Sequence, residues 1–309
     1  MNEADEALLA LLAALRDDSY RFVTTTPETH RRVLERRPGA IAGDSRDVFG
    51  WSLPFRESLL PSRLLDPLLR SGLVERIGDH LKSLVRISSI GGSLFLHSAY
   101  PTDAEDSVFL GPDTYRFVSL LEVEIPRLPK VCHVVDIGTG AGVGGIVAGR
   151  IAGAGEVTLT DVNPAALRLA RINAAHAGVR VETRLGSGLD GVEGAVDLVI
   201  ANPPFVIDEA GRAYRDGGDM HGAALSLDWT LAAARRIEPD GAVILYTGTA
   251  IAGGEDGLKA ALQRELPALD CSLAYREIDP DIFGELVSEP AYRDVDRVAA
   301  VGAVIRRGP

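Results

Sequence analysis

The sequence contains little cysteine, with only Cys132 and Cys271 in a chain of 309 residues. The two lie far apart and show no CxxC or other metal-ligand spacing, so neither a disulfide framework nor a metal site is expected. Both thiols are predicted to be buried and inert. No apolar run is long enough to cross a bilayer, and Glu3, Asp5 and Glu6 stand where a signal peptide would be basic. We therefore expect a cytoplasmic protein without a membrane partner.

An excess of positive charge is also missing, because the net charge at pH 7 is −12. Residues 1–105 hold 13 Lys and Arg against 15 Asp and Glu, whereas residues 106–309 hold 19 against 29. Binding nucleic acid through its phosphates needs clustered cations, so this balance favours a protein or peptide partner over RNA or DNA. One basic cluster falls on a predicted helix and is interpreted as a solvated face rather than an RNA-binding patch; its members are Arg31, Arg32, Arg36 and Arg37.

The length suggests two domains, and the pattern of residues changes near position 105. The first part predicts three helices, at 4–15, 27–37 and 63–71. A β-hairpin is expected at 84–98, because two β-rich runs flank Gly91-Gly92. This order is similar to a winged-helix module, so residues 1–105 are predicted to form a small α+β domain that recruits the substrate.

Residues 106–309 alternate β-rich runs with helical stretches, which is typical of βαβ units in a parallel sheet covered on both faces. Five strands are expected in this order, at 133–138, 156–161, 180–185, 196–201 and 242–248. Helices are expected at 164–177 and 223–236. The last two β-rich runs, 271–278 and 297–305, are predicted to form an antiparallel hairpin at one sheet edge. The predicted fold of this domain is therefore α/β and Rossmann-like.

A glycine-rich run joins the first of these strands to the following helix. Gly138, Gly140 and Gly142 let the backbone turn sharply and approach a ligand closely. Asp161 ends the next strand, where a carboxylate can accept hydrogen bonds from both ribose hydroxyls of a nucleoside. The cofactor-binding residues predicted from these two turns are Asp136, Gly138, Thr139, Gly140, Gly142, Asp161 and Val162.

The same glycines satisfy the GxGxxG dinucleotide fingerprint, so by themselves they do not separate S-adenosylmethionine from NAD. Two features favour S-adenosylmethionine. The Asp136 carboxylate can face the cationic methionyl portion of that cofactor and would repel an NAD pyrophosphate. In addition, the fourth predicted strand, at 196–201, is followed by a loop with the sequence Asn-Pro-Pro-Phe, and such a loop has no role in hydride transfer. An NAD-dependent oxidoreductase and a non-catalytic protein that keeps the cofactor fold as a scaffold remain as alternatives.

That second loop reads Asn202-Pro203-Pro204-Phe205 and follows an apolar strand, whose carboxyl end is where open α/β sheets bind ligands. The Asn202 side-chain carbonyl and the Pro203 backbone carbonyl can each accept an N–H of a planar nitrogen. Together they would draw its lone pair towards a sulfonium methyl group. Two prolines keep these acceptors rigid, and Phe205 can stack on the planar group. Asn202, Pro203, Pro204 and Phe205 are therefore the predicted catalytic residues.

With these two loops the chain resembles the class I S-adenosylmethionine-dependent methyltransferases that carry an Asn-Pro-Pro-aromatic motif. They include HemK-like glutamine N5-methyltransferases and N6-adenine or guanine-N2 RNA methyltransferases. The resemblance covers about residues 108–309. It implies a seven-stranded sheet with an antiparallel last strand, ribose binding by Asp161 and binding of the target nitrogen by the Asn202 loop.

Two further positions follow from this resemblance. The run from Phe109 to Tyr115 is similar to a segment that covers the cofactor in HemK-like enzymes, which would place Asp113 and Thr114 in the cofactor pocket. Alternatively, this run simply starts the next helix. Where many relatives carry an acid that reaches the adenine amino group, this chain has Ser187, which would make a weaker contact. The resemblance implies methylation of a protein or peptide glutamine, with an adenine or guanine amino group of RNA or DNA as the alternative.

Overall fold

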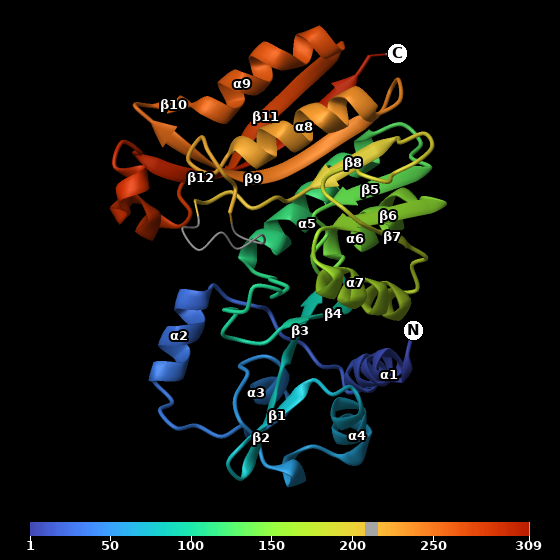
Figure 1. Ribbon diagram of the computed structural model, residues 1–309, viewed down its shortest axis with the longest axis vertical. Coiled ribbons are helices and arrows are strands. Elements are labelled where there is room, and N and C mark those ends of the chain that lie inside the picture. Colours follow the sequence, from blue (N-terminus) through green and yellow to red (C-terminus); the bar gives the residue numbers. More distant parts are fainter. Residues whose placement is uncertain (208–215, 309) are drawn as a thin grey trace.

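The computed structural model describes residues 1–207 and 216–308 (Figure 1). Its central sheet has the strand order β7 (Glu182–Leu185), β6 (Glu156–Asp161), β5 (His133–Ile137), β8 (Leu198–Ala201), β9 (Ala242–Ala252), β12 (Arg297–Arg307) and β11 (Cys271–Asp279). The strands from β7 to β9 pair in parallel, whereas β12 is antiparallel to both of its neighbours. The expected sheet and its closing hairpin are therefore confirmed, and the short β10 (Glu255–Asp256) adds a further pairing with β9.

Helices cover both faces of this sheet because successive strand side chains point to opposite sides. On one face, Val134 and Leu198 pack in a cluster with residues of α5 (Pro112–Glu124) and α6 (Val143–Ala152). On the other, Val135 and Val199 pack with residues of α8 (Ala224–Arg236) and α9 (Gly257–Glu265). The remaining helix, α7 (Pro164–Ala177), lies against β6.

The predicted elements of this domain agree with the structure to within a few residues, and the bounds of β6 and α7 match. Helix α9 is an addition that the sequence analysis did not predict. Its signals are modest: the Asp256 side chain caps it by accepting a hydrogen bond from the Lys259 N–H at 3.0 Å, and Leu258 and Leu262 form its buried stripe.

The first part of the chain holds four helices and two hairpins among its described elements, and it lies below the sheet in Figure 1. The predicted helices and the predicted hairpin are confirmed, whereas α3 and the β1–β2 hairpin are additions. In chain order the elements are α1 (Glu3–Asp17), α2 (Pro27–Glu35), α3 (Ser45–Phe49), α4 (Ser62–Arg70), β1 (Val74–Ile77), β2 (His80–Ser83), β3 (Val85–Ile90) and β4 (Ser93–Ser98).

The two parts of the chain share one hydrophobic core. Buried leucines of α1 belong to the same cluster as Leu169 and Ile172 of α7. Asn173, also on α7, is fully buried; its Oδ1 accepts the Leu96 N–H at 2.8 Å. Its Nδ2 donates to the carbonyls of Leu96 at 3.0 Å and of Ala141 at 2.8 Å. A single amide therefore connects strand β4 to the glycine loop.

The structure corrects one expectation about cysteine. Cys271 is buried at the start of β11, but Cys132 is exposed, so its predicted burial was wrong. Cys132 stands one position before β5, and burial along this strand begins with His133. Within residues 1–207 and 216–308, no group of three or more His, Cys, Asp or Glu is arranged to hold a metal ion. Over the same residues, no helix combines the length and apolarity that a membrane span requires.

Candidate active site

A cavity of about 1120 Å³ lies at the carboxyl ends of the parallel strands and extends to the start of α2. Gly142 is the one predicted site residue that does not line it. Gly142 caps α6 at a φ of 82°, and a Cβ there would lie 2.9 Å from the Cβ of Ala170. The predicted residues that do line the cavity are Asp113, Thr114, Asp136, Gly138, Thr139, Gly140, Asp161, Val162, Ser187, Asn202, Pro203, Pro204 and Phe205.

Two carboxylates hold the glycine loop in shape. The Asp136 Oδ2 accepts hydrogen bonds from the Thr139 hydroxyl at 2.6 Å and from the Gly145 N–H at 2.7 Å. The Asp161 Oδ2 accepts the Gly140 N–H at 2.9 Å. Gly140 has a φ of 53°, in the left-handed region that glycine adopts without strain. Contacts within the chain therefore fix the loop beneath the cavity.

The same carboxylates shape the electrostatics of the cavity. Burial raises the pKa of Asp136 to about 7, against the hydrogen bonds from Thr139 and Gly145, and the nearby charge of Asp161 raises it as well. Burial also raises the pKa of Asp161. A positively charged ligand would stabilise the ionised form of both groups, so this wall favours a cation.

Trp229 of α8 forms a wall of the cavity that the sequence analysis did not single out. A Cβ on Gly138, which has a φ of 63°, would lie 2.7 Å from the Trp229 ring. A Cβ on Gly188 would lie 3.8 Å from its Nε1. The indole therefore lies beside the turns that follow β5 and β7, next to the exposed Ser187. In the sequence, Trp229 is simply an aromatic residue in a predicted helix, and helical periodicity alone would assign it to the hydrophobic core.

The Asn202 loop is held mainly by packing. Phe205 lies against β9, where a Cβ on Gly248 would overlap its ring, and its centroid is 5.7 Å from that of Phe283. Pro203 is buried. Asn202 is half-buried at the cavity, and its side chain makes no hydrogen bond to any residue that the structure describes. Its amide therefore keeps its hydrogen-bonding capacity for a ligand.

Asp113 lines the cavity from α5 and is 7% exposed. Its Oδ1 accepts the Tyr246 hydroxyl at 2.7 Å and a guanidinium N–H of Arg116 at 3.3 Å. Burial raises the pKa of Asp113, while the hydrogen bond from Tyr246 opposes that shift. The stretch starts a helix, as one interpretation predicted, because Pro112 begins α5. Asp113 and Thr114 also line the cavity, and their assignment to a cofactor pocket stays a prediction.

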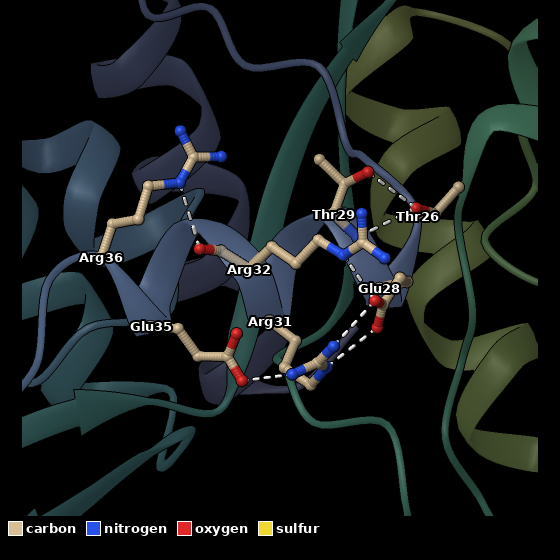
Figure 2. Close-up of polar contacts among 7 residues, drawn as sticks. All are labelled: Thr26, Glu28, Thr29, Arg31, Arg32, Glu35 and Arg36. Carbon is tan, nitrogen blue, oxygen red and sulfur yellow. Dashed lines mark hydrogen bonds and ion pairs between the residues drawn. The ribbon is translucent and has the colours of Figure 1, made fainter.

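Two of the four arginines in the basic cluster, Arg31 and Arg32, pair with carboxylates on their own helix (Figure 2). Arg31 donates to Glu28 at 2.7 and 2.8 Å and also pairs with Glu35, while Arg32 donates to Glu28 at 2.6 Å. The Arg36 Nε donates to the Arg32 carbonyl at 3.3 Å. These pairs reduce the positive charge available to phosphates, in agreement with the predicted solvated face.

Comparison with known proteins identifies a family match and relatives that are similar in sequence. Residues 117–216 match the model of the methyltransferase small domain family. Release factor glutamine methyltransferase of Deinococcus radiodurans is 33% identical over 180 residues, which are 56% of this chain and 62% of the relative. Ribosomal RNA small subunit methyltransferase C of Ectopseudomonas mendocina is 31% identical over 115 residues, which are 33% of this chain and 34% of the relative. The matches thus span less than two thirds of either relative.

A solved structure shares the fold. Trm5b from Pyrococcus abyssi aligns with 76% of this chain and 62% of its own, with a TM-score of 0.51 and 15% sequence identity. At this level of identity the likeness concerns the fold alone.

Proposed function

We propose that the chain is a class I S-adenosylmethionine-dependent methyltransferase and that it methylates a planar nitrogen, namely a glutamine side-chain amide of a protein or peptide. The match of residues 117–216 to the methyltransferase small domain family and the names of the relatives support the first part. The observation that carries this proposal is the half-buried Asn202 amide, which lies in the cavity and has no hydrogen-bond partner among the described residues. The NAD-dependent alternative is set aside, because the family and the relatives are methyltransferases.

The cofactor half of the cavity suits S-adenosylmethionine, which supplies an electrophilic methyl group on a positively charged sulfur. Asp136 and Asp161 provide the negative wall that such a cation needs. In the proposal Asp161 accepts hydrogen bonds from the ribose hydroxyls. Val162 and Ser187 lie on the turns next to it and would border the adenine, while Asp113 and Thr114 close the pocket from α5.

The part of the cavity around the Asn202 loop, which would bind the acceptor, orients the acceptor nitrogen and does not need to supply a strong base. An amide nitrogen is a poor nucleophile because its lone pair is delocalised. The Asn202 Oδ1 and the Pro203 carbonyl would accept its two N–H groups and hold the lone pair in line with the methyl carbon. As the new C–N bond forms, the C–S bond breaks and its electron pair stays on sulfur. The nitrogen, now positively charged, then releases a proton to solvent.

The charge of the cavity supports a protein acceptor over nucleic acid, and the Deinococcus relative is named as a glutamine methyltransferase. The second candidate is an adenine or guanine amino group in RNA. The aromatic Phe205, which offers a stacking surface, and the ribosomal RNA relative favour it.

Incubation with methyl-labelled S-adenosylmethionine and cell extract tests the proposal. We expect the label to disappear from macromolecules after protease treatment and to survive nuclease treatment. The reverse pattern would establish the nucleic-acid alternative. Wild-type protein that transfers no label above the level of Asn202→Ala would refute methyl transfer at this site.

A further inference from the structure

The segment between β11 and β12 forms a wall of the cavity for which the sequence analysis assigned no role. Residues Asp281, Ile282, Phe283, Glu285 and Leu286 all line the cavity. The ring of Phe283 lies 5.7 Å from that of Phe205 at an interplanar angle of 51°. A second aromatic side chain therefore stands beside the loop that binds the acceptor in the proposed function.

The backbone at Phe283 is unusual for so bulky a residue. Its φ of 54° and ψ of 45° lie in the left-handed region, which glycine adopts freely and phenylalanine does not. The Phe283 carbonyl accepts the Leu286 N–H at 2.9 Å, which holds the turn in place. Strain of this kind persists where surrounding contacts over-determine the conformation. Here the contact is between the two aromatic rings at the cavity.

The charge on this cavity is almost entirely of one sign. Among the described residues that line it, nine carry a carboxylate and one, Arg116, carries a guanidinium. Arg116 is already bonded to Asp113 and to Asp279, at 3.3 and 3.0 Å. Asp281 and Glu285, which are exposed on either side of Phe283, form no ion pair with any described residue. Arg297 interacts electrostatically with Asp281 but is bonded to Glu277 at 2.9 and 3.0 Å, so the carboxylates of Asp281 and Glu285 can still pair with an incoming cation.

The opposite side of the cavity does not offset this charge. Glu28 lines the cavity at the start of α2, and Figure 2 shows it holding both Arg31 and Arg32. Farther along, Arg37 is bonded to Asp47 through two contacts of 2.8 Å. Arg36, which pairs with no described carboxylate, does not line the cavity. A phosphate backbone that entered the cavity would therefore meet the carboxylates of Asp281 and Glu285 and no unpaired cation among the described lining residues.

We propose that the contacting rings of Phe205 and Phe283 together form one aromatic wall of the cavity, against which a planar amide packs. Asp281 and Glu285 then select a peptide in which basic residues flank the methylated glutamine. This inference rests on the proposed function and adds the chemistry of the acceptor segment to it. The two carboxylates act as specificity-determining residues at the rim, while Phe283 contacts the acceptor itself.

Binding measurements with defined probes test the charge selection. The probes are two synthetic peptides with a central glutamine, flanked by lysines in one and by glutamates in the other, and an oligoadenylate RNA of the same length. Fluorescence anisotropy measures their binding to protein saturated with S-adenosylhomocysteine. At low salt the lysine-flanked peptide should bind roughly tenfold more tightly than the glutamate-flanked one, since two exposed ion pairs contribute.

The double variant Asp281→Asn/Glu285→Gln should remove most of that preference. Its matched control, Glu193→Gln/Glu238→Gln, makes the same change in charge at exposed residues that do not line the cavity, and it should keep the preference. Tighter binding of RNA, absence of peptide binding or an unchanged preference in the double variant would each overturn the inference. Wild-type protein that failed to bind S-adenosylhomocysteine would instead refute the proposed function.

A glycine substitution isolates the role of the Phe283 ring. Phe283→Gly removes the ring and relieves the backbone strain, while lost packing and a more flexible unfolded chain act in the opposite direction. Its melting temperature should therefore stay within a few degrees of the wild type. Binding of both peptides should weaken roughly tenfold, while calorimetric binding of S-adenosylhomocysteine stays unchanged. Phe283→Tyr should restore peptide binding. Wild-type peptide affinity in Phe283→Gly would contradict the role of this aromatic wall in binding the acceptor.

Discussion

The two loops that meet at the cavity are held in place by different kinds of contact. In the glycine loop, the buried Asp136 and the half-buried Asp161 accept hydrogen bonds from backbone and hydroxyl groups. In the second loop, Phe205 is held by packing against Gly248, while the Asn202 side chain has no hydrogen-bond partner among the described residues. One loop is fixed by its own polar contacts, and the other is fixed by apolar ones.

This difference indicates that the glycine loop and the Asn202 loop have different functions. Polar contacts in a buried site are directional and costly to leave unmade, so they suit a half that must present a constant shape to a cofactor. Apolar packing positions a loop without using its polar groups, which leaves them free for an acceptor. Substitutions in the first loop should therefore affect cofactor affinity, and substitutions around the second should affect methyl transfer.

The largest effect is expected from Asn202→Ala. Loss of the acceptor carbonyl should lower the single-turnover rate of methyl transfer by about 10²-fold, because the nitrogen is no longer oriented. Calorimetry with S-adenosylhomocysteine should give the wild-type affinity. A variant that bound normally and transferred methyl at the wild-type rate would remove the basis for assigning the second loop to the acceptor.

Asp161→Asn should produce the opposite pattern. A neutral amide has one carbonyl oxygen in place of two charged ones, and both oxygens of Asp161 accept backbone N–H bonds in the structure. The calorimetric Kd for S-adenosylhomocysteine should rise about 10- to 100-fold. Asp228→Asn, an exposed change on α8 outside the cavity, serves as the control. Equal affinities of the two variants would exclude Asp161 from cofactor binding.

Gly248→Ala tests packing as the support of the second loop. The new Cβ would overlap the Phe205 ring, so the ring must move. We expect transfer to fall about tenfold through misplacement of the acceptor, with cofactor affinity unchanged. Gly257→Ala, which meets open space, should leave both quantities at wild-type values. Full activity of Gly248→Ala would show that the position of Phe205 is not critical.

The smallest effect concerns Asp136 and pH. Its folded-state pKa of about 7 is raised above the ordinary 3.8, so the folded chain binds this proton more tightly than the unfolded chain. Its contribution to stability is fully present below the unfolded pKa and is lost as pH rises through about 7. The melting temperature should therefore fall by a few degrees between about pH 5 and pH 8. Asp136→Asn should flatten that fall, and an unchanged slope would contradict the shift.

Much of the fold could be predicted because it depends on local patterns. The apolar runs of β5 and β8 are buried on both faces, and Pro164 and Gly178 mark the two ends of α7. The loops that carry chemistry could be predicted for the same reason, since each follows a recognisable strand. Helix α9 was missed because its capped, nine-residue pattern is short.

The rest of the site depends on contacts between distant residues. Phe283 meets Phe205 only because β11 and β12 place their connection at the cavity. Trp229 covers Gly138, and Asn173 joins Leu96 to Ala141, through the packing of α8 and α7. In the sequence these are ordinary aromatic and amide residues within or between elements. Only the folded arrangement gives them a position at the site.

The identity of the methylated atom tests the account most directly. The protein is incubated with cell extract and S-adenosylmethionine that carries a deuterated methyl group, and tandem mass spectrometry locates the added group. We predict that it lies on the side-chain amide nitrogen of glutamine. Deuterated methyl groups found on oxygen, on sulfur or on a lysine amine would contradict the proposed role of Asn202 in holding a planar nitrogen.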